Sequence, residues 1–543
     1  MACTPPRFVY QPGILTPYRR QTLGARPTLK KKSEKHLTQM KSHIFSCGCG
    51  LLLATAAAAQ ERPNVIFLVA DDLGYGDLSC YGAKGVSTPH TDSLAREGVL
   101  FTDAHAVAST STPSRYSLLT GQYAFRRPGT DIAAGNAGMI IHPEQYTLAD
   151  LFRSQGYHTY AVGKWHLGLG SLTGKQDWNG TLDQDLHDLG FDHYYIMAAT
   201  ADRTPCVYIK DGRVANYDPS APIYVSYQKN FEGEPTGASH PELLTKLKPS
   251  HGHDQSIVNG ISRIGYMKGG GRALWRDEDI ADSIITQAIG YMEQAGKEPF
   301  FMYLCTNDVH VPRYPHERFR GKSPMGLRGE AILQFDYTVG QITAALRRLG
   351  LAENTLIVLT SDNGPVLDDG YQDRAVELCG DHRPSGPFRG GKYSTYEAGT
   401  TVPFIVSWPG HTRRHTSRAL VSHIDAMASM AALLGTELPD QAGPDSRDYL
   451  NTWLGRKRKG RDHVVEMSVN RSLSVRQGKW KYTEPSDGAP RAWQTGIETG
   501  YRKVPQLFDL KKSVYEQTNV FEQHPERGRQ LQQLLEEIKQ GRP

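Results

Sequence analysis

Cysteines are scarce and scattered in this 543-residue sequence, which has seven in all. Residues 60–543 keep Cys80, Cys206, Cys305 and Cys379, too few for a disulfide scaffold in so long a chain. The sequence has no CxxC pair and no cysteine–histidine cluster that indicates a zinc site. It also lacks an internal repeat and an apolar run of membrane-spanning length. We therefore expect a globular protein with no integral membrane segment.

An excess of positive charge is confined to the N-terminal segment. The chain has 62 Lys/Arg and 57 Asp/Glu, and residues 1–59 hold nine of the basic residues but only one acid, Glu34. The remainder has 53 basic and 56 acidic residues. Because the body of the protein has no net positive charge, we expect no nucleic-acid partner.

The stretch MKSHIFSCGCGLLLATAAAAQERPN, from Met40, is typical of a secretory signal. It has a basic start, a short apolar centre and an A-x-A end at residues 57–59, directly before Gln60. We predict that residues 40–59 are a signal peptide, cleaved after Ala59, and that residues 1–39 are a misassigned upstream extension. A translated basic leader is the alternative for 1–39. Cys47 raises the alternative of a lipoprotein, but the apolar stretch follows this cysteine. The mature protein would be exported, and periplasmic or secreted.

Two apolar runs end abruptly in polar side chains. Residues 65–70 are followed by Asp71 and Asp72, and residues 356–359 lead to Asp362 and Asn363. Continuous apolar runs are typical of strands buried on both faces of a parallel sheet. Sites in open α/β sheets lie beyond the carboxyl ends of the strands. If these two strands are neighbours, three carboxylates and one amide oxygen meet at one edge.

Strand and helix patterns alternate along the rest of the chain. This alternation predicts an α/β fold over residues 60–455, with a large mixed, mostly parallel, doubly wound sheet flanked by helices. From residue 462 the pattern changes to short antiparallel strands and a final amphipathic helix, which predicts a smaller C-terminal α+β subdomain at 462–543. A basic linker at 455–462 separates the two. The further strands expected in the large sheet are 157–168, 299–312 and 401–410, and the helices are 117–123, 147–156 and 278–296.

A run of hydroxyl residues precedes the first of these helices. Alone, the sequence STPSR from Ser111 to Arg115 could be no more than a good helix cap. It resembles, however, the sulfatase signature (Cys or Ser)-x-Pro-Ser-Arg, followed here by LLTG. GKWHLG (163–168), DNG (362–364) and FRGGKYSTYEAG (388–399) look like the other signatures of that family and occur in its order. With the DD pair after the first strand, the sequence is similar to the sulfatase family of the alkaline phosphatase superfamily from Asn64 onward, most of all to exported bacterial glycan sulfatases.

The resemblance implies that Ser111 is the modified nucleophile. It would be oxidised after translation to formylglycine (3-oxoalanine), an aldehyde that hydrates to a gem-diol. One hydroxyl would attack sulfur, and the second would later expel sulfate and restore the aldehyde. Plain serine has no second hydroxyl and could be trapped as a sulfate ester.

The resemblance also implies a metal ion beside Ser111. The ligands would be Asp71, Asp72, Asp362 and Asn363, together with residue 111. These are hard oxygen donors with no sulfur or imidazole among them, which favours Ca²⁺ or Mg²⁺ over zinc. The family pattern favours Ca²⁺.

Basic side chains complete the implied catalytic set. Arg115, Lys164 and Lys392 would offset negative charge at the sulfate oxygens. His310 would donate a proton to the departing oxygen, and His166 would take a proton from the second hydroxyl during sulfate release.

The sequence departs from the family pattern at two places. Position 111 is Ser rather than Cys, which implies maturation by an anaerobic-type radical enzyme that acts before export. EAGTTVP has Ala398 and Thr401 where the family usually has Gly and Arg, so one arginine contact is absent near Thr401.

Substrate specificity is expected in a long insertion at about 200–272. Asp202, Arg203 and His253, with His251, could hydrogen-bond sugar hydroxyls, which favours a sulfated glycan, although a surface loop whose polar residues only face water is an equal alternative. The other functions left open are an arylsulfatase of small esters, a phosphate-ester hydrolase with histidine-bound transition metals, a non-catalytic glycan-binding protein and a structural envelope protein.

Overall fold

The structure is a computed structural model and describes residues 62–541. The predicted signal peptide at 40–59, Cys47 and the extension at 1–39 lie outside the described residues. Within 62–541, no helix combines the length and the apolar character needed to cross a bilayer. The four cysteines of this part of the chain are free thiols.

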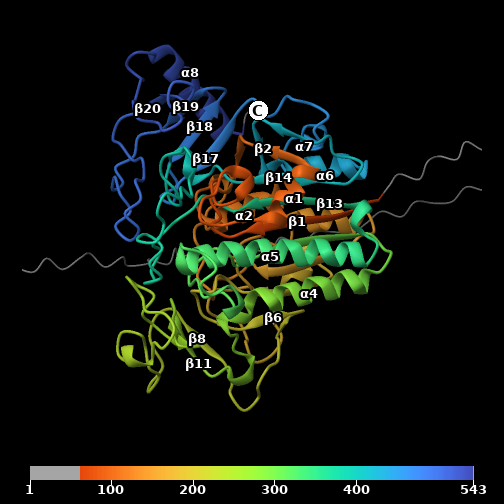
Figure 1. Cartoon of the computed structure of the whole chain (residues 1–543), viewed down its shortest axis with the longest axis vertical. Coiled ribbons are helices and arrows are strands. Elements are labelled where there is room, and N and C mark those ends of the chain that lie inside the picture. Colours follow the sequence, from red (N-terminus) through yellow and green to blue (C-terminus); the bar gives the residue numbers. More distant parts are fainter. Residues whose placement is uncertain (1–61, 542–543) are drawn as a thin grey trace, which may run out of the picture. The chain divides into compact units, whose positions relative to one another are not determined.

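A ten-stranded sheet lies at the centre of the fold, in the order β15-β2-β14-β13-β1-β12-β4-β5-β6-β7 (Figure 1). Strands β13, β1, β12, β4 and β5 are parallel neighbours, and β14 and β6 pair antiparallel at either side. This confirms the mixed, mostly parallel sheet. The strands are β1 (Asn64–Ala70), β2 (Val99–Phe101), β4 (His158–Lys164), β5 (His193–Met197), β6 (Tyr208–Lys210), β7 (Arg213–Val214), β12 (Phe300–Cys305), β13 (Thr355–Ser361), β14 (Phe404–Ser407) and β15 (His415–Ser417).

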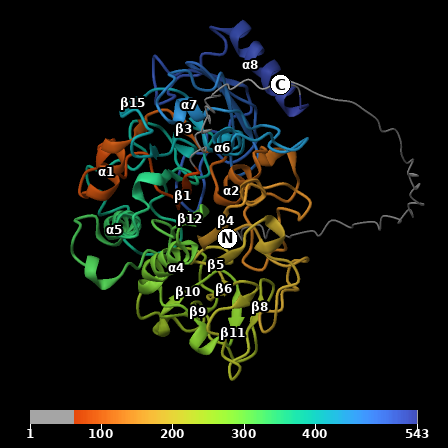
Figure 2. The same cartoon turned by 90° about the vertical axis from the view of Figure 1, so that its right-hand side faces the viewer.

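Helices cover both faces of the sheet because the buried side chains of each central strand alternate between the faces. Val65 and Phe67 of β1 share one apolar cluster with α2, α3 and α6. Ile66 and Leu68 share the other with α4 and α5, which lie side by side in Figures 1 and 2. The sheet is therefore doubly wound, as predicted. The helices are α1 (Pro89–Glu97), α2 (Ser111–Thr120), α3 (Leu148–Ser154), α4 (Ile280–Ala295), α5 (Gly326–Arg348), α6 (Ala426–Leu434) and α7 (Leu450–Trp453).

The C-terminal part forms a second, antiparallel sheet in the order β17-β18-β19-β20, with helix α8 against it (Figure 1). The helix buries Leu531, Leu535 and Ile538, which recur every three or four residues along one face. The predicted small C-terminal sheet with a helix is confirmed, whereas the boundaries at 455 and 462 stay a prediction. The elements are β17 (Val464–Met467), β18 (Leu473–Gln477), β19 (Trp480–Thr483), β20 (Gln506–Asp509) and α8 (Pro525–Lys539).

Strand β17 holds the chain that leads into α2. The Met467 N–H donates to the Val107 carbonyl at 3.0 Å, and the Ser109 N–H donates to the Met467 carbonyl at 2.9 Å. Buried Lys481 of β19 also pairs with Glu397 at 3.0 Å, in the segment that follows Lys392. The C-terminal sheet thus supports two segments that carry predicted site residues.

Three two-stranded pairings lie outside these two sheets in the described residues. In the 200–272 insertion, β8 (Tyr224–Ser226) pairs with β11 (Tyr266–Lys268), and β9 (Ile257–Val258) pairs with β10 (Ile261–Ser262). Elsewhere β3 (Ala104–His105) pairs with β16 (Val421–Ser422). The insertion therefore contains one short hairpin, β9–β10, and one antiparallel pairing between segments distant in the sequence, β8–β11.

Candidate active site

The polar residues after β1 and β13 meet at the carboxyl edge of the sheet. The two strands are parallel neighbours, with Ala70 opposite Ser361, so that Asp71 and Asp362 leave the sheet side by side. The Asp72 N–H donates to Asp362 Oδ1 at 3.2 Å, and Asn363 Nδ2 donates to Asp72 Oδ1 at 2.7 Å. The three carboxylates and the amide thus lie together, as the sequence predicts.

Ser111 begins helix α2 directly beside this group. Its hydroxyl donates to Asn363 Oδ1 at 3.3 Å and accepts a hydrogen bond from Lys164 Nζ at 2.7 Å. Lys164 is the last residue of β4. Because the positive end of the helix dipole and the free N–H groups of the first turn lie here, the position favours a bound anion.

Two buried cations lie among the carboxylates. Lys164 Nζ bonds to Asp71 Oδ1 at 2.6 Å, and Arg115 Nε donates to Asp362 Oδ2 at 2.9 Å. Burial, followed by the negative charge of Asp362 and Asp72, raises the pKa of Asp71 well above its ordinary value against the opposing charge of Lys164. Burial acts to raise the pKa of Asp362 as well, but Arg115 and Lys164 outweigh it and hold that pKa below its ordinary value.

The donor set fits a hard divalent cation. Asp71 Oδ2 is buried and has no hydrogen-bond partner, which is costly for a carboxylate oxygen unless a cation contacts it. The neighbouring oxygens belong to Asp72, Asp362, Asn363 and Ser111. An all-oxygen set of this kind suits Ca²⁺.

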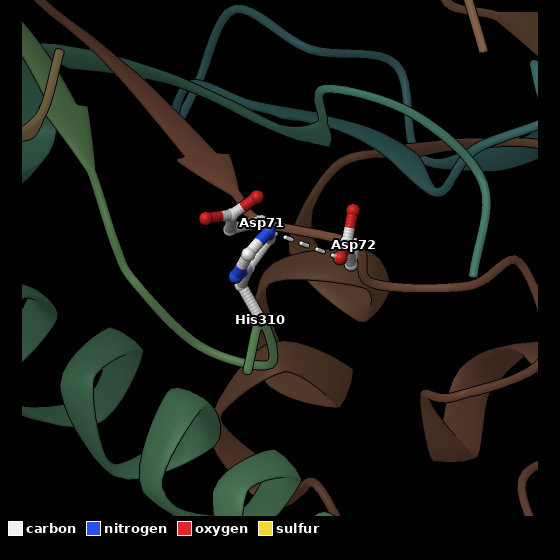
Figure 3. A group of neighbouring side chains, drawn as sticks. All are labelled: Asp71, Asp72 and His310. Carbon is white, nitrogen blue, oxygen red and sulfur yellow. Dashed lines mark ion pairs between the residues drawn. The ribbon is translucent and has the colours of Figure 1, made fainter. Parts of the chain in front are cut away.

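His310 lies against the same carboxylates (Figure 3). Its Nε2 is 3.7 Å from Asp72 Oδ2, and it is close enough to Asp71 and Asp72 to form a three-residue metal-binding geometry. Its Nδ1, however, donates to the Val311 carbonyl at 2.6 Å, so Nε2 carries the lone pair and accepts from Lys392 Nζ at 3.2 Å. The lone pair on His310 Nε2, which a metal ion would need, is therefore already bound by Lys392. The oxygen atoms of the carboxylates, Asn363 and Ser111 are better candidates for metal ligands than His310.

Burial and nearby positive charge disfavour the charged form of both predicted catalytic histidines. Burial and then the charge of Lys392 lower the pKa of His310 well below its ordinary value. Burial and then Lys164 do the same for the pKa of His166. His166 Nε2 donates to the Ala133 carbonyl at 2.9 Å, which leaves its buried Nδ1 without a partner. A buried lone pair beside the start of α2 can accept a proton.

The predicted substrate-binding residues lie on the His310 side of the site. Arg203 Nη1 bonds to Asp202 Oδ1 at 2.8 Å, and His253 Nε2 is 3.1 Å from Asp202 Oδ2. The charge of Asp202 acts on the pKa of His310. Asp202, Arg203 and His253 therefore form a cluster of their own that influences His310 through the charge of Asp202. The individual roles of the predicted site residues stay predictions.

Sequence reasoning missed two residues of this group. Asp369 Oδ2 accepts from Lys392 Nζ at 2.8 Å, and Asp369 Oδ1 accepts from the Tyr393 hydroxyl at 2.9 Å. Asp369 occurs in a DDG triplet, which also suits an ordinary turn. Tyr393 gives no sequence signal beyond its place next to Lys392. Together they fix the position of the Lys392 ammonium.

Close packing of the backbone explains why the DNG motif ends in a glycine, Gly364. A Cβ at this position would lie 1.7 Å from the Ala398 carbonyl oxygen. The Gly364 N–H donates to the Gly399 carbonyl at 2.9 Å. The glycine thus lets the segment that carries Asp362 and Asn363 pack directly on the YEAG segment.

A buried ion pair holds the loop after Asp71 and Asp72. Asp77 accepts two bonds from Arg328 of α5, at 2.8 and 2.7 Å, one from the Gly74 N–H at 2.7 Å, and its Oδ1 lies 2.7 Å from His382 Nε2. Burial acts to raise the pKa of Asp77, but Arg328 and His382 outweigh it and lower that pKa to about 2. Asp77 is therefore a positioning residue for the predicted metal ligands.

The Asp77→Asn variant is expected to unfold more easily at neutral pH, by about 3–5 kcal/mol, because Arg328 stays buried without its counter-charge. The folded-state pKa lies below the ordinary 3.8, so the wild-type carboxylate contributes stability above pH 3.8 and loses it as the pH falls towards 2. The difference in unfolding free energy between wild type and Asp77→Asn, measured by urea unfolding, should therefore become smaller from pH 5 to pH 3. The exposed control Asp381→Asn should change stability by less than about 0.5 kcal/mol. A deficit that is constant with pH would contradict the ionised pair.

Carboxylates, buried cations and a hydroxyl at a helix start together suit a hydrolase of anionic esters. The family model described as sulfatase matches residues 63–436. The chain is 51% identical over 480 residues to an N-acetylgalactosamine-6-O-sulfatase of Bacteroides thetaiotaomicron. The aligned region covers 88% of this chain and 94% of that protein. It is 30% identical over 487 residues to human arylsulfatase A, with coverage of 87% and 86%. The chain therefore belongs to the sulfatase family and is a sulfuric ester hydrolase.

Solved structures agree with this assignment. A B. thetaiotaomicron structure described in connection with the metabolism of multiple glycosaminoglycans superposes with a TM-score of 0.87 at 51% identity, over 88% of this chain and 100% of that chain. A phosphonate monoester hydrolase of Agrobacterium radiobacter, at 18% identity and a TM-score of 0.55, shares the fold alone. The phosphate-ester, non-catalytic and structural alternatives are therefore set aside.

Proposed function

We propose that the protein removes sulfate esters from glycans, with 6-O-sulfated N-acetylgalactosamine as the first substrate to test. The likeness to the B. thetaiotaomicron N-acetylgalactosamine-6-O-sulfatase over nearly the whole of both chains supports this substrate. The observation that carries the chemistry is that Asp71, Asp72, Asp362 and Asn363 meet beside Ser111, whose hydroxyl bonds to Asn363 and Lys164. An insertion with polar side chains beside His310 suits a sugar better than a bare aryl group.

The proposed nucleophile is formylglycine formed from Ser111. A hydrated aldehyde at this position would offer two hydroxyl groups on one carbon, one to form the bond to sulfur and one to allow its later release. Lys164 Nζ, 2.7 Å from Ser111 Oγ, would stabilise negative charge on that oxygen. The proposal includes a radical maturation enzyme as a partner, acting before an exported protein leaves the cytoplasm.

A Ca²⁺ ion held by the five oxygen-bearing side chains would supply a fixed double positive charge next to the sulfate group. The chain itself contributes three cations to the same charge. Arg115 and Lys164 lie on the Asp362 side, and Lys392 lies between Asp72 and His310. Because these groups are buried and already in place, little reorganisation is needed as charge develops on the sulfate oxygens.

The two histidines would move protons in the two successive steps of the reaction. His166 Nδ1 is an unpartnered acceptor beside α2 and would take the proton from the second hydroxyl. His310 Nε2 faces Lys392 and Asp72 and would protonate the departing sugar oxygen. A bound sulfate anion would raise the pKa of His310, since a nearby negative charge favours the imidazolium form.

Two measurements test the proposed function directly. Mass spectrometry of the peptide that contains residue 111 should show the loss of two hydrogen atoms in protein produced with its maturation enzyme. That protein should release sulfate from N-acetylgalactosamine 6-sulfate. An unmodified serine in active protein would contradict the nucleophile, and activity on aryl sulfates without activity on any sulfated saccharide would contradict the glycan substrate.

His310→Ala is expected to slow hydrolysis of a sugar sulfate by about 10²–10⁴-fold, because a sugar alkoxide is a poor leaving group without a proton. The same variant should slow a nitrophenyl sulfate by less than about tenfold, since an acidic phenol leaves as its anion. The ratio of kcat values for the two esters is the measurement. His415→Ala, on edge strand β15, is the control and should change neither rate. An equal loss on both esters would assign His310 a role other than proton donor.

A further inference from the structure

An exposed tryptophan lies on the C-terminal part, in a hairpin next to the active site. Trp493 is 77% exposed, more than any other large apolar side chain among the described residues. Arg491 and Glu498 pair antiparallel, and the Ala492 N–H donates to the Ile497 carbonyl at 2.9 Å, so Trp493 lies near the tip of the hairpin. Water contact with most of an indole is unfavourable, and the packing of the fold does not require this side chain.

The hairpin is fixed to the segment that carries Lys392. Glu498 accepts two hydrogen bonds from Arg389, at 2.7 and 3.1 Å, and a third from Arg491 at 3.2 Å. The Thr395 N–H donates to the Thr499 carbonyl at 2.8 Å. The tryptophan is therefore presented from a braced loop, which lowers the entropy cost of binding a ligand.

A short series of contacts leads from the active site to this side chain. Lys392 bonds to Asp369 at 2.8 Å, and the preceding residue, Asp368, accepts from the Ser250 hydroxyl at 2.8 Å. His251 follows Ser250, and its ring centroid is 6.0 Å from that of Trp493. Three segments distant in the sequence, 248–253, 366–372 and 489–500, thus meet beside Lys392.

The burial of Ser111 limits which part of a glycan can reach it. Residue 111 is only 3% exposed and His310 only 4%, so the reacting ester has to reach buried groups. The sugars beyond the sulfated one would then contact the surrounding surface. Sugar rings have apolar C–H faces that stack on aromatic rings, and indole offers the largest such surface among side chains.

We propose that Trp493, with His251 beside it, binds the sugar attached to the sulfated residue and so makes the enzyme prefer oligosaccharides over the sulfated monosaccharide. The indole stacks on the C–H face of this sugar, while His251, Ser250 and Asp368 lie within reach of its hydroxyl edge. This inference rests on the proposed function, because it assumes a glycan in the site. It adds a specificity-determining residue from the C-terminal part of the chain.

Two substrates with the same reacting ester distinguish binding of the second sugar by Trp493 from a general effect of Trp493 on catalysis. The first is N-acetylgalactosamine 6-sulfate, and the second is a trisaccharide with that sugar at its non-reducing end. Trp493→Ala should lower kcat/KM for the trisaccharide about tenfold, mainly through KM, and leave the monosaccharide within twofold of wild type. Trp493→Phe should retain most of the trisaccharide activity. Val514→Ala, which shortens an apolar side chain that is 43% exposed on the C-terminal part, should change the activity on neither substrate.

Equal effects of Trp493→Ala on both substrates, or no effect on the trisaccharide, would overturn the stacking role. Calorimetric binding of the trisaccharide to Ser111→Ala protein separates this result from a failure of the proposed function. If the wild type released no sulfate but the trisaccharide bound in a way that depends on Trp493, the proposed function would be contradicted and the role of Trp493 would stand. Binding that is equally tight with and without Trp493→Ala in that background would contradict the inference itself.

Discussion

Ser111→Ala is expected to lower sulfate release by on the order of 10⁵-fold, because loss of a covalent nucleophile removes the whole bond-forming step. The fold should be unchanged, since the Ser111 hydroxyl contributes one bond to Asn363 and one to Lys164. Initial rates on N-acetylgalactosamine 6-sulfate, together with thermal unfolding of both proteins, provide the measurement.

Ser109→Ala is a close control for this variant. Ser109 is also buried, and its hydroxyl has no hydrogen-bond partner, so its loss should change the rate by less than about tenfold. If Ser111→Ala retained more than a small percentage of wild-type turnover, the nucleophile would have to be another group and the modification at residue 111 would have no catalytic purpose.

Removal of the proposed Ca²⁺ ion is expected to have the second-largest effect. Chelation should lower activity by about 10²–10³-fold, because the developing charge on the sulfate loses its largest fixed counter-charge. Added Ca²⁺ should restore the rate better than Zn²⁺, since the ligands are hard oxygens. Metal analysis of the purified protein should find one Ca²⁺ per chain.

The Asp362→Asn variant tests the same metal site by changing one of its proposed ligands. The variant keeps an oxygen but loses the charge that pairs with Arg115 and Lys164, so both Ca²⁺ affinity and activity should fall. Asp440→Asn, an exposed residue, should leave both unchanged. Better recovery with Zn²⁺ than with Ca²⁺, or normal Ca²⁺ binding by Asp362→Asn, would contradict the proposed ligand set.

Much of the site could be predicted because each key residue follows a strand or begins a helix with its own local signal. The apolar run before Asp71 and the one before Asp362 each predict a buried strand, and parallel pairing then brings both ends together. Helix α2 begins at Ser111, within the STPSR motif, and Pro113 is its third residue rather than the first helical position that proline favours. The sequence motif around Lys392 predicted that this residue belongs to the site. The neighbouring sequence does not indicate which groups surround its ammonium.

The sequence by itself indicated the central strands of the large sheet, several of the helices and the polar residues at the strand ends, because local periodicity and motifs encode these features. Tertiary structure alone decided the partners of those residues. The pairing of Asp77 with Arg328 joins residues 251 positions apart, and the contact of His251 with Trp493 joins two separate loops. Such contacts depend on how distant segments pack, and each segment viewed alone has the composition of an ordinary loop.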